Sequence, residues 1–180
     1  MENQRQSKHQ IIFDTCIIQY ATDSKYSEEV SSLITRLSQK FEFAMSAISI
    51  YEVFGGLGSS KADRQKIHDR KAFCDSLVKI PIEIDHVRFA SALCTFYRNH
   101  PHTKYHSDKY KLADTLIGSQ ALMITGFVLT ANRVDFPFPF FTEVPEETYI
   151  LKPERERAID IALLKPSVTA FNEQHGVTFS

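Results

Sequence analysis

Hydrophobic and polar positions along this chain form two patterns, short continuous apolar runs and longer segments with helical spacing. The apolar runs at residues 10–13 and 127–130 predict strands that are buried on both faces. Residues 27–39 and 111–124 carry apolar side chains three and four positions apart, which predicts amphipathic helices. Strands that alternate with helices are typical of a parallel sheet covered by helices, so we expect a doubly wound α/β fold.

Weaker patterns predict the remaining elements. We expect helices at 15–20, from 49 to the glycines that begin at 55, at 62–78 and at 87–97, and strands at 41–47 and 80–84. Farther on, the pattern predicts a strand at 148–151, a short helix at 154–164 and no periodic structure after Pro166. The predicted organisation is a loose N-terminus (1–9), an α/β domain (10–144) and a C-terminal extension (145–180).

Composition narrows the function classes. The 180-residue chain has a formal charge of -1, so contact with a polyanion needs a local basic patch. No apolar run approaches the ~18 residues of a membrane span, and the first ten residues lack the apolar core of a signal peptide. Cys16, Cys74 and Cys94 are widely spaced and odd in number, which predicts free thiols and a cytoplasmic protein.

Four acidic residues occur near predicted strand-to-helix junctions or helix starts. Asp14 directly follows the first strand, Glu52 lies in the helix after the second, Asp114 opens the strongest helix, and Asp135 follows the strand at 127–130. Parallel strands bring such junctions to one edge of a sheet, where ligands bind in open α/β folds. Clustered carboxylates raise one another's pKa, and a divalent cation removes that penalty. Mg²⁺ and Mn²⁺ prefer oxygen ligands, and such a cation can lower a water's pKa and neutralise charge at a phosphodiester.

Each acid also has a purely structural explanation. Asp14 can cap the following helix, and Ser49 with Glu52 matches a capping box. Asp114 can complement a helix dipole, and Asp135 can pair with Arg133 at the surface. The hypothesis of a site depends on the coincidence of all four.

The segments IIFDTCII, SAISIYEVFGG, KLADTLIGSQAL and VLTANRVDF together resemble the signature of PIN-domain ribonucleases, in particular the VapC-type toxins of toxin–antitoxin pairs. The resemblance covers about residues 10–143 in the family's order. It implies a parallel sheet of four or five strands flanked by helices (PIN-like), followed here by the C-terminal extension. It also implies Mg²⁺- or Mn²⁺-dependent endonucleolytic cleavage of RNA. Because PIN-domain toxins are commonly dimers held inactive by a partner, it suggests a homodimer and an antitoxin.

Carried over by position, the resemblance makes four acids the catalytic and metal-binding residues, and three small polar residues their support. The acids are Asp14, Glu52, Asp114 and Asp135, and the supporting residues are Thr15, Thr130 and Asn132. Cys16 departs from the family, which often has Asn or Ser there, and the extension at 145–180 has no counterpart. Neither departure removes a ligand.

Other features have two interpretations each. Lys104, Lys109, Lys111 and Arg133 are candidate RNA contacts, and basic residues also crowd positions 61–71, although a solvated helix face and a polar loop are the simpler explanation. His100, His102 and His106 lack a clear fourth zinc ligand, so an exposed loop is the better explanation. The segment FPFPFF at 136–141 predicts core packing, and any exposed part of it would mark a partner surface.

Three alternatives to a toxin stay open at this stage. One is a PIN-fold module that binds RNA or protein without catalysis, although the presence of all four acids counts against it. Another is an RNA-processing nuclease that is not a toxin, which a neighbouring antitoxin gene would distinguish. A phosphatase of the haloacid-dehalogenase type needs a second Asp two residues after Asp14, where this chain has Cys16.

Overall fold

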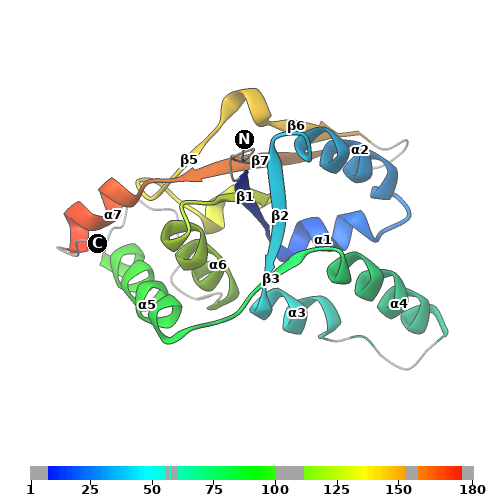
Figure 1. Cartoon of the computed structure of the whole chain (residues 1–180), viewed down its shortest axis with the longest axis horizontal. Helices are drawn as coiled ribbons and strands as arrows, with labels where there is room; N and C mark the ends of the chain where they lie inside the picture. Colours follow the sequence, from blue (N-terminus) through cyan, green and yellow to red (C-terminus); the bar gives the residue numbers. More distant parts are fainter. Residues whose placement is uncertain (1–7, 56, 58–60, 100–111, 153–157, 176–180) are drawn as a thin grey trace, which may run out of the picture.

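The computed structural model describes residues 8–55, 57, 61–99, 112–152 and 158–175, in which one mixed sheet is flanked by helices (Figure 1). The strands are β1 (His9–Phe13), β2 (Phe41–Ser46), β3 (Val78–Ile80), β4 (Phe127–Thr130), β5 (Phe141–Glu143), β6 (Tyr149–Leu151) and β7 (Ile159–Pro166). The helices are α1 (Thr15–Ala21), α2 (Ser27–Leu37), α3 (Ala47–Phe54), α4 (Lys61–Asp75), α5 (Ile84–Asn99), α6 (Leu112–Met123) and α7 (Val168–His175). Two 3-10 turns, η1 (Arg133–Asp135) and η2 (Pro145–Glu147), complete them.

The parallel half of the sheet has the order β3-β2-β1-β4, with β1 between β2 and β4. Ile11, Ile12 and Phe13 of β1 are all fully buried. Ile11 and Phe13 pack into one core and Ile12 into the other, because successive side chains of a strand face opposite sides. The prediction of a parallel sheet flanked by helices is confirmed for these four strands.

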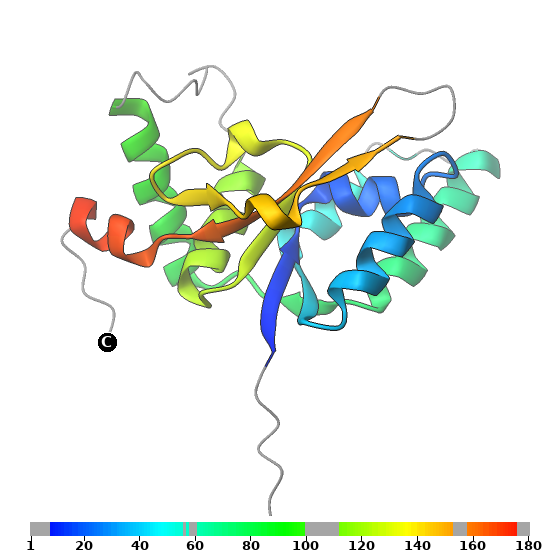
Figure 2. The ribbon, with the colours of Figure 1, turned by 90° about the horizontal axis from the view of Figure 1, so that it is seen from above.

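Helices cover both faces of this sheet. Figure 2 shows α5, α6 and α7 on one side and α1, α2, α3 and α4 on the other. The core on the side of Ile12 includes Leu93 of α5, Ile117 of α6 and Phe171 of α7. The core on the side of Ile11 and Phe13 includes Val30 and Leu33 of α2. The molecule is therefore a three-layer α/β structure. Within the described ranges, no helix is both long and apolar enough to cross a membrane.

The C-terminal part of the chain extends the sheet with antiparallel strands. β7 pairs with β4 on one side and with β5 and β6 on the other. The prediction of a helix at 154–164 is wrong for its described part, because Ile161–Leu164 is a continuous buried run that is paired on both sides. The strand predicted at 148–151 is confirmed as β6. The division into segments 1–9, 10–144 and 145–180 stays a prediction.

Helix α7 occupies the region after Pro166 for which we expected no periodic structure, so that prediction is also wrong. Its Phe171 is buried, stacks on Phe89 of α5 at 5.2 Å between ring centroids and contacts Phe140 at 5.4 Å. The backbone N–H of Ala170 donates to the Ser167 hydroxyl at 3.3 Å, a cap at the helix start. Phe171, the partly buried Val168 and Ala170 and the Ser167 cap hold this helix, and its short apolar set does not produce a helical period.

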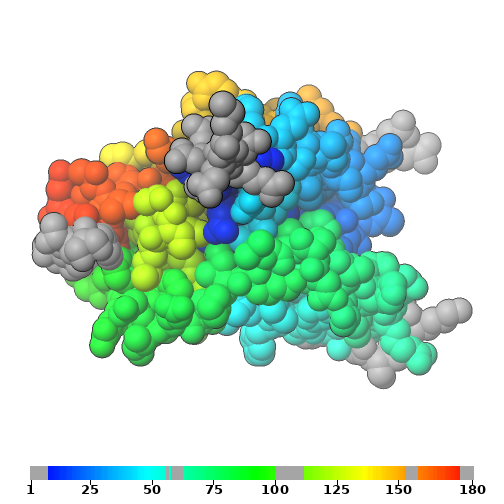
Figure 3. Space-filling view, in the orientation of Figure 1, coloured from blue at the N-terminus to red at the C-terminus, as the bar shows by residue number. Residues whose placement is uncertain are grey.

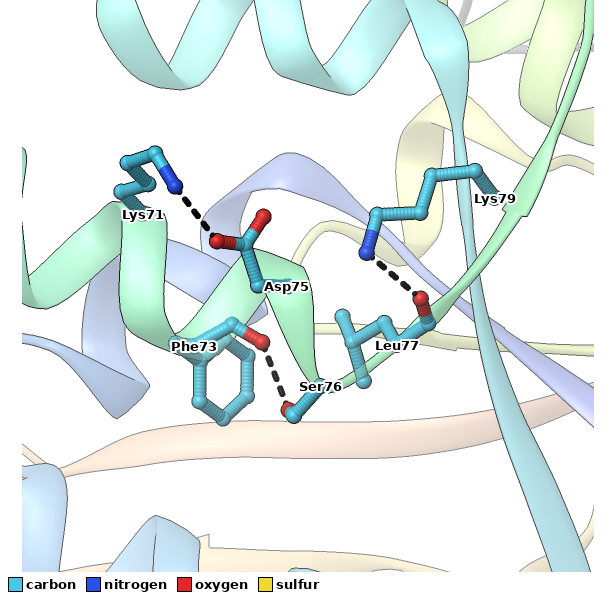
Figure 4. A network of polar contacts seen from close by, with 6 residues as sticks. All are labelled: Lys71, Phe73, Asp75, Ser76, Leu77 and Lys79. Atoms are coloured by element: carbon cyan, nitrogen blue, oxygen red, sulfur yellow. Dashed lines mark hydrogen bonds and ion pairs between the residues drawn. The ribbon is translucent and has the colours of Figure 1, made fainter.

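The connection from α4 to β3 corrects two predicted boundaries. Helix α4 ends at Asp75 instead of at 78, and strand β3 covers 78–80 instead of 80–84. Figure 4 shows the cause, a turn in which the Ser76 hydroxyl donates to the Phe73 carbonyl at 2.6 Å and Lys79 Nζ donates to the Leu77 carbonyl at 2.8 Å. Pro81 cannot donate to the sheet, so the strand ends before it. The α4–β3–α5 segment then crosses one face of the molecule (Figure 3).

Candidate active site

The centre of the sheet contains a topological switch point. After β1 the chain crosses through α1 and α2 to β2 on one side, whereas β4 lies on the other side of β1. The connections leave in opposite directions and open a crevice at the carboxyl ends of β1 and β4, where open α/β sheets bind ligands. Figure 1 shows α1 and α3 at the end where β1 and β2 finish. All four sequence-predicted acids belong to elements that start or end near this edge.

Asp14 directly follows β1, and its backbone N–H donates to the Leu129 carbonyl of β4 at 3.0 Å. It occupies the N-cap position of α1, but its side chain makes no capping bond. Its Oδ2 instead accepts from the Thr130 hydroxyl at 2.6 Å and from the Cys16 thiol at 3.1 Å. The capping explanation of this carboxylate is therefore wrong, because the side chain points across the sheet edge to β4.

Glu52 reaches the same edge from helix α3. The cap of this helix is Ser46, whose hydroxyl accepts from the backbone N–H of Ile48 at 3.3 Å. Ser49 lies inside the helix, so the capping-box explanation of Ser49 and Glu52 is wrong. The Oε2 atom of Glu52 accepts from the Thr15 hydroxyl at 2.6 Å, which ties α3 to the start of α1.

Asp114 and Asp135 complete the acidic set from the other side of the switch point. Asp114 lies in the first turn of α6 and is only 5% exposed. Asp135 ends η1, and its Oδ2 accepts from the side-chain amide of Asn132. The backbone N–H of Asn132 donates to the Thr130 hydroxyl at 2.8 Å. Thr130 thus connects the turn that carries Asp135 to the carboxylate of Asp14.

One depression of about 360 Å³ contains all four acids. Its lining residues are Asp14, Thr15, Cys16, Gln19, Glu52, Asp114, Asn132 and Asp135. Thr130 is fully buried beneath it. Sequence reasoning missed Gln19 as a lining residue, although its position one helical turn after Thr15 places both on one face of α1. It also gave Cys16 no role, because a lone thiol carries no pattern.

Burial dominates the electrostatics of Asp14. Its pKa is raised above the usual value of 3.8, first because the carboxyl is buried and also because Asp135 is negative. The hydrogen bonds from Thr130, Cys16 and the Thr15 backbone oppose this rise in pKa. Burial and the charge of Asp14 raise the pKa of the Cys16 thiol as well. Cys16 therefore stays protonated at neutral pH and acts as a hydrogen-bond donor.

The donor set of the depression suits a hard, hydrated cation. No group of three acidic, histidine or cysteine side chains in the described part of the chain is arranged to hold a metal ion. Mg²⁺ needs fewer protein ligands, because it usually keeps several waters and is bound through one or two carboxylates. The volume of about 360 Å³ leaves room for such waters, each of which needs about 10–15 Å³ on this measure. The acids thus fit a partly hydrated divalent cation.

The other candidate residues of the sequence lie elsewhere or outside the described ranges. The Arg133 guanidinium forms an ion pair with Glu143 at 3.2 Å. Lys104, Lys109 and Lys111 fall outside the described residues, as do His100, His102 and His106. The basic residues of α4 include Arg64, Lys66 and Lys71, which are exposed, and Lys71 pairs with Asp75 at 2.7 Å. Their predicted contact with RNA stays a prediction.

Fold and site together define a three-layer α/β protein with an acidic depression at the carboxyl ends of its central parallel strands. No protein-family model and no curated protein sequence matches the chain. Solved structures do match in fold, and they include two VapBC complexes and a toxin–antitoxin complex.

A chain in the crystal structure of VapBC2 from Rickettsia felis bound to a promoter DNA fragment matches with a TM-score of 0.59 and 21% identity, covering 71% of this chain and 90% of that one. A chain of DNA-bound VapBC from Salmonella typhimurium gives a TM-score of 0.58 and 15% identity at the same coverage of 71% and 90%. A toxin–antitoxin complex from Klebsiella pneumoniae gives 0.53 and 23%, covering 71% of this chain and 91% of that one. At these identities the likeness establishes the fold, and the predicted PIN-like α/β architecture is confirmed.

Proposed function

We propose that this chain is a Mg²⁺- or Mn²⁺-dependent endoribonuclease of the VapC type. The observation that carries the proposal is the convergence of Asp14, Glu52, Asp114 and Asp135 on one depression at the switch point of the sheet. These acids come from four separate elements of the chain, and the two that have capping explanations in the sequence use their side chains for other contacts. The fold shared with toxin–antitoxin complexes supports the same function.

The side chains of the site have distinct tasks in this proposal. A bound divalent cation supplies Lewis-acid chemistry, neutralising charge on the phosphodiester and making a water more acidic. Asp14 and Asp114, both nearly buried, provide negative charge that the solvent screens least. Thr130 and Cys16 occupy Oδ2 of Asp14 and fix the direction of the carboxylate. Thr15 and Asn132 do the same for Glu52 and Asp135.

The proposal extends to partners. The fold neighbours are complexes of a toxin with an antitoxin, and two of them hold DNA. We infer that this chain also has an antitoxin partner and forms a homodimer, with RNA as its substrate. Co-expression with the product of an adjacent small reading frame tests the partner, since a toxin's growth inhibition would be relieved by it.

Cleavage of a panel of structured RNAs, transfer and ribosomal RNA included, tests the enzyme. The purified chain is assayed with Mn²⁺, with Mg²⁺ and with EDTA, alongside Asp14→Asn. Asp160→Asn is the matched control, because Asp160 is an exposed carboxylate on β7 that does not line the depression. We expect discrete cuts that require the metal, persist in the control and disappear in Asp14→Asn. Full activity of Asp14→Asn would refute the assignment, and absence of both cleavage and divalent-ion binding by calorimetry would favour a binding module.

A further inference from the structure

The aromatic segment 136–141 is divided between the core and the surface. Phe136, Phe140 and Phe141 are buried, which confirms the core packing expected from the sequence. Phe138 is 73% exposed although it stands between two core residues. An exposed phenyl ring has no stabilising role in the core, so its surroundings on the surface decide what it does.

Phe138 lines a groove of about 660 Å³ at the amino ends of β1 and β4. His9, the first residue of β1, and Phe127, the first residue of β4, line the same groove. These ends are opposite to the carboxyl ends that carry the acids, so the groove and the acidic depression lie at opposite edges of the parallel strands. The groove is the larger of the two.

The charge of the groove is opposite to that of the acidic depression. Among the described residues that line it, Lys165 and His9 are the basic side chains, and none is acidic. Among the described residues no carboxylate forms an ion pair with Lys165. Thr169 adds a hydroxyl group, a frequent partner of phosphate oxygens, whereas the Thr142 hydroxyl donates to the Lys165 carbonyl at 3.5 Å. A polyanion is therefore attracted at this edge of the sheet and repelled by the acids of the other in the absence of a cation.

The aromatic rings of the groove provide surfaces for stacking. The His9 and Phe127 rings pack edge to face, with centroids 6.0 Å apart and planes at 77°. Phe138 adds a third ring that is free to solvent over most of its surface. Aromatic rings beside a positive charge are the combination with which proteins bind single-stranded nucleic acid, since every base can stack and every phosphate is negative.

We propose that this groove binds a nucleotide of single-stranded RNA, with a base on Phe138 and a phosphate near Lys165, outside the cleavage site. The inference rests on the proposed ribonuclease function, because it assigns the groove to the substrate of that enzyme. Lys165 and the groove's hydroxyl groups favour a phosphate, whereas an apolar peptide or a second copy of the chain would use mainly the exposed ring.

Fluorescence anisotropy with a labelled single-stranded oligouridylate tests the groove without cleavage. The full-length Asp14→Asn protein is used in EDTA, so that neither metal nor hydrolysis contributes. Phe138→Ala should weaken binding at least about fivefold, the lower end of what one lost base–aromatic stack costs. Phe138→Tyr should bind like the parent, since it keeps a stacking ring. Lys165→Gln should weaken binding and lower the slope of log affinity against log salt by roughly 0.7, the contribution of one phosphate contact.

Ile150→Ala is the matched control, because Ile150 is an apolar residue of β6, 54% exposed, that does not line the groove. Equal affinity of Phe138→Ala and the control would overturn the proposal. So would a dimer of the parent that dissociates in Phe138→Ala by light scattering, since the ring would then be an interface between copies. Binding that depends on Phe138 in a chain that cleaves no RNA would uphold the groove and reject the nuclease. Cleavage of long RNA that Phe138→Ala leaves unchanged would uphold the nuclease and reject the groove.

Discussion

Two carboxylates of this chain, Glu147 and Asp14, are held in opposite ways. Glu147 in η2 accepts from the Tyr149 hydroxyl and from Lys40 Nζ at 3.0 Å, and the guanidinium of Arg36 lies 3.9 Å above the Tyr149 ring. The hydrogen bond from Tyr149, followed by that from Lys40, lowers the pKa of Glu147. Within the described residues Asp14 accepts from a hydroxyl, a thiol and the backbone, and burial raises its pKa.

The comparison separates a charge that the protein compensates from one that it leaves uncompensated. Around Glu147 the cations come from the chain itself, so the carboxylate is stable as an anion after folding. Among the described residues the donors around Asp14 are neutral, and the charge of Asp135 raises its pKa further. Folding therefore places Asp14 where an external cation gains most, because that cation supplies the positive charge which the described residues do not.

Removing a second acid should have the largest effect. We expect Asp114→Asn to lower metal-dependent cleavage at least about a hundredfold, the scale of a lost electrostatic contact to the reacting group. An amide oxygen lacks the charge that attracts the cation, so a higher Mn²⁺ concentration should recover part of the rate. Initial rates across a Mn²⁺ titration measure both the loss of rate and its partial recovery, with Asp160→Asn as control. A rate within threefold of the parent would show that Asp114 has only a structural role.

Breaking the compensated carboxylate should reduce stability without touching the site. Glu147→Gln should lower the free energy of unfolding by about 1–2 kcal/mol at pH 7, because hydrogen bonds to a charged group are lost. Since the folded-state pKa is lowered, this contribution is present above the ordinary pKa of 4.5 and disappears as pH falls through the folded-state value. Urea unfolding at pH 7 and near pH 3 checks both. Glu146→Gln, an exposed neighbour in the same turn, should change neither.

Neutralising Asp14, the uncompensated carboxylate, should increase stability instead of reducing it. In EDTA at pH 7 we expect Asp14→Asn to raise Tm by about 2–4 °C, what 1 kcal/mol gives a chain of this size. Because its pKa is raised, Asp14 binds a proton more tightly in the folded state than in the unfolded state. The parent therefore loses stability as the pH rises above 3.8, and the difference in Tm between the variant and the parent grows. Near pH 3 the two proteins should melt alike. Saturating Mn²⁺ should stabilise only the parent, and a parent that melts above the variant in EDTA would contradict the comparison.

Changing the thiol donor should have the smallest effect. Cys16→Ser should keep the cleavage rate within about threefold, because a hydroxyl can donate to Asp14 and accept from the Ala131 N–H as Sγ does, at 3.1 and 3.4 Å. Cys16→Ala removes one of the two donors to Oδ2 and should cost about fivefold. Single-turnover rates at saturating Mn²⁺ distinguish them. If both variants behaved like the parent, Thr130 alone would fix the carboxylate.

The positions of the four acids could be predicted because each follows from local sequence. Asp14 ends an apolar run and Asp114 opens a strong helix, and parallel topology then brings them to one edge. The contacts that orient the acids could not be predicted. The hydrogen bond from Thr130 to Asp14 joins residues 116 positions apart, and only the pairing of β1 with β4 creates it.

The extension shows where periodicity fails. Ile159 and Leu163 are four residues apart, which fits a helix, but Ile161–Leu164 is buried at every position because β7 lies between β4 and β5. A short apolar run covered on both faces has no period, so the sequence cannot distinguish a strand from a helix there. The sequence likewise does not predict which phenylalanine of 136–141 is exposed, since that depends on how this segment packs against the sheet.

Strand β7 is synthesised after the strand that it covers. The ribosome makes β4 and all four acids by residue 135, whereas the strand that covers the outer edge of β4 follows at Ile159–Pro166. Thr130, which orients Asp14, pairs with Ala162 of β7. A growing chain therefore contains all four acids before this pairing can form. Until then the uncovered edge invites pairing with other chains. A strand that lends no residue to the depression thus completes the sheet around it only after all four acids have been synthesised.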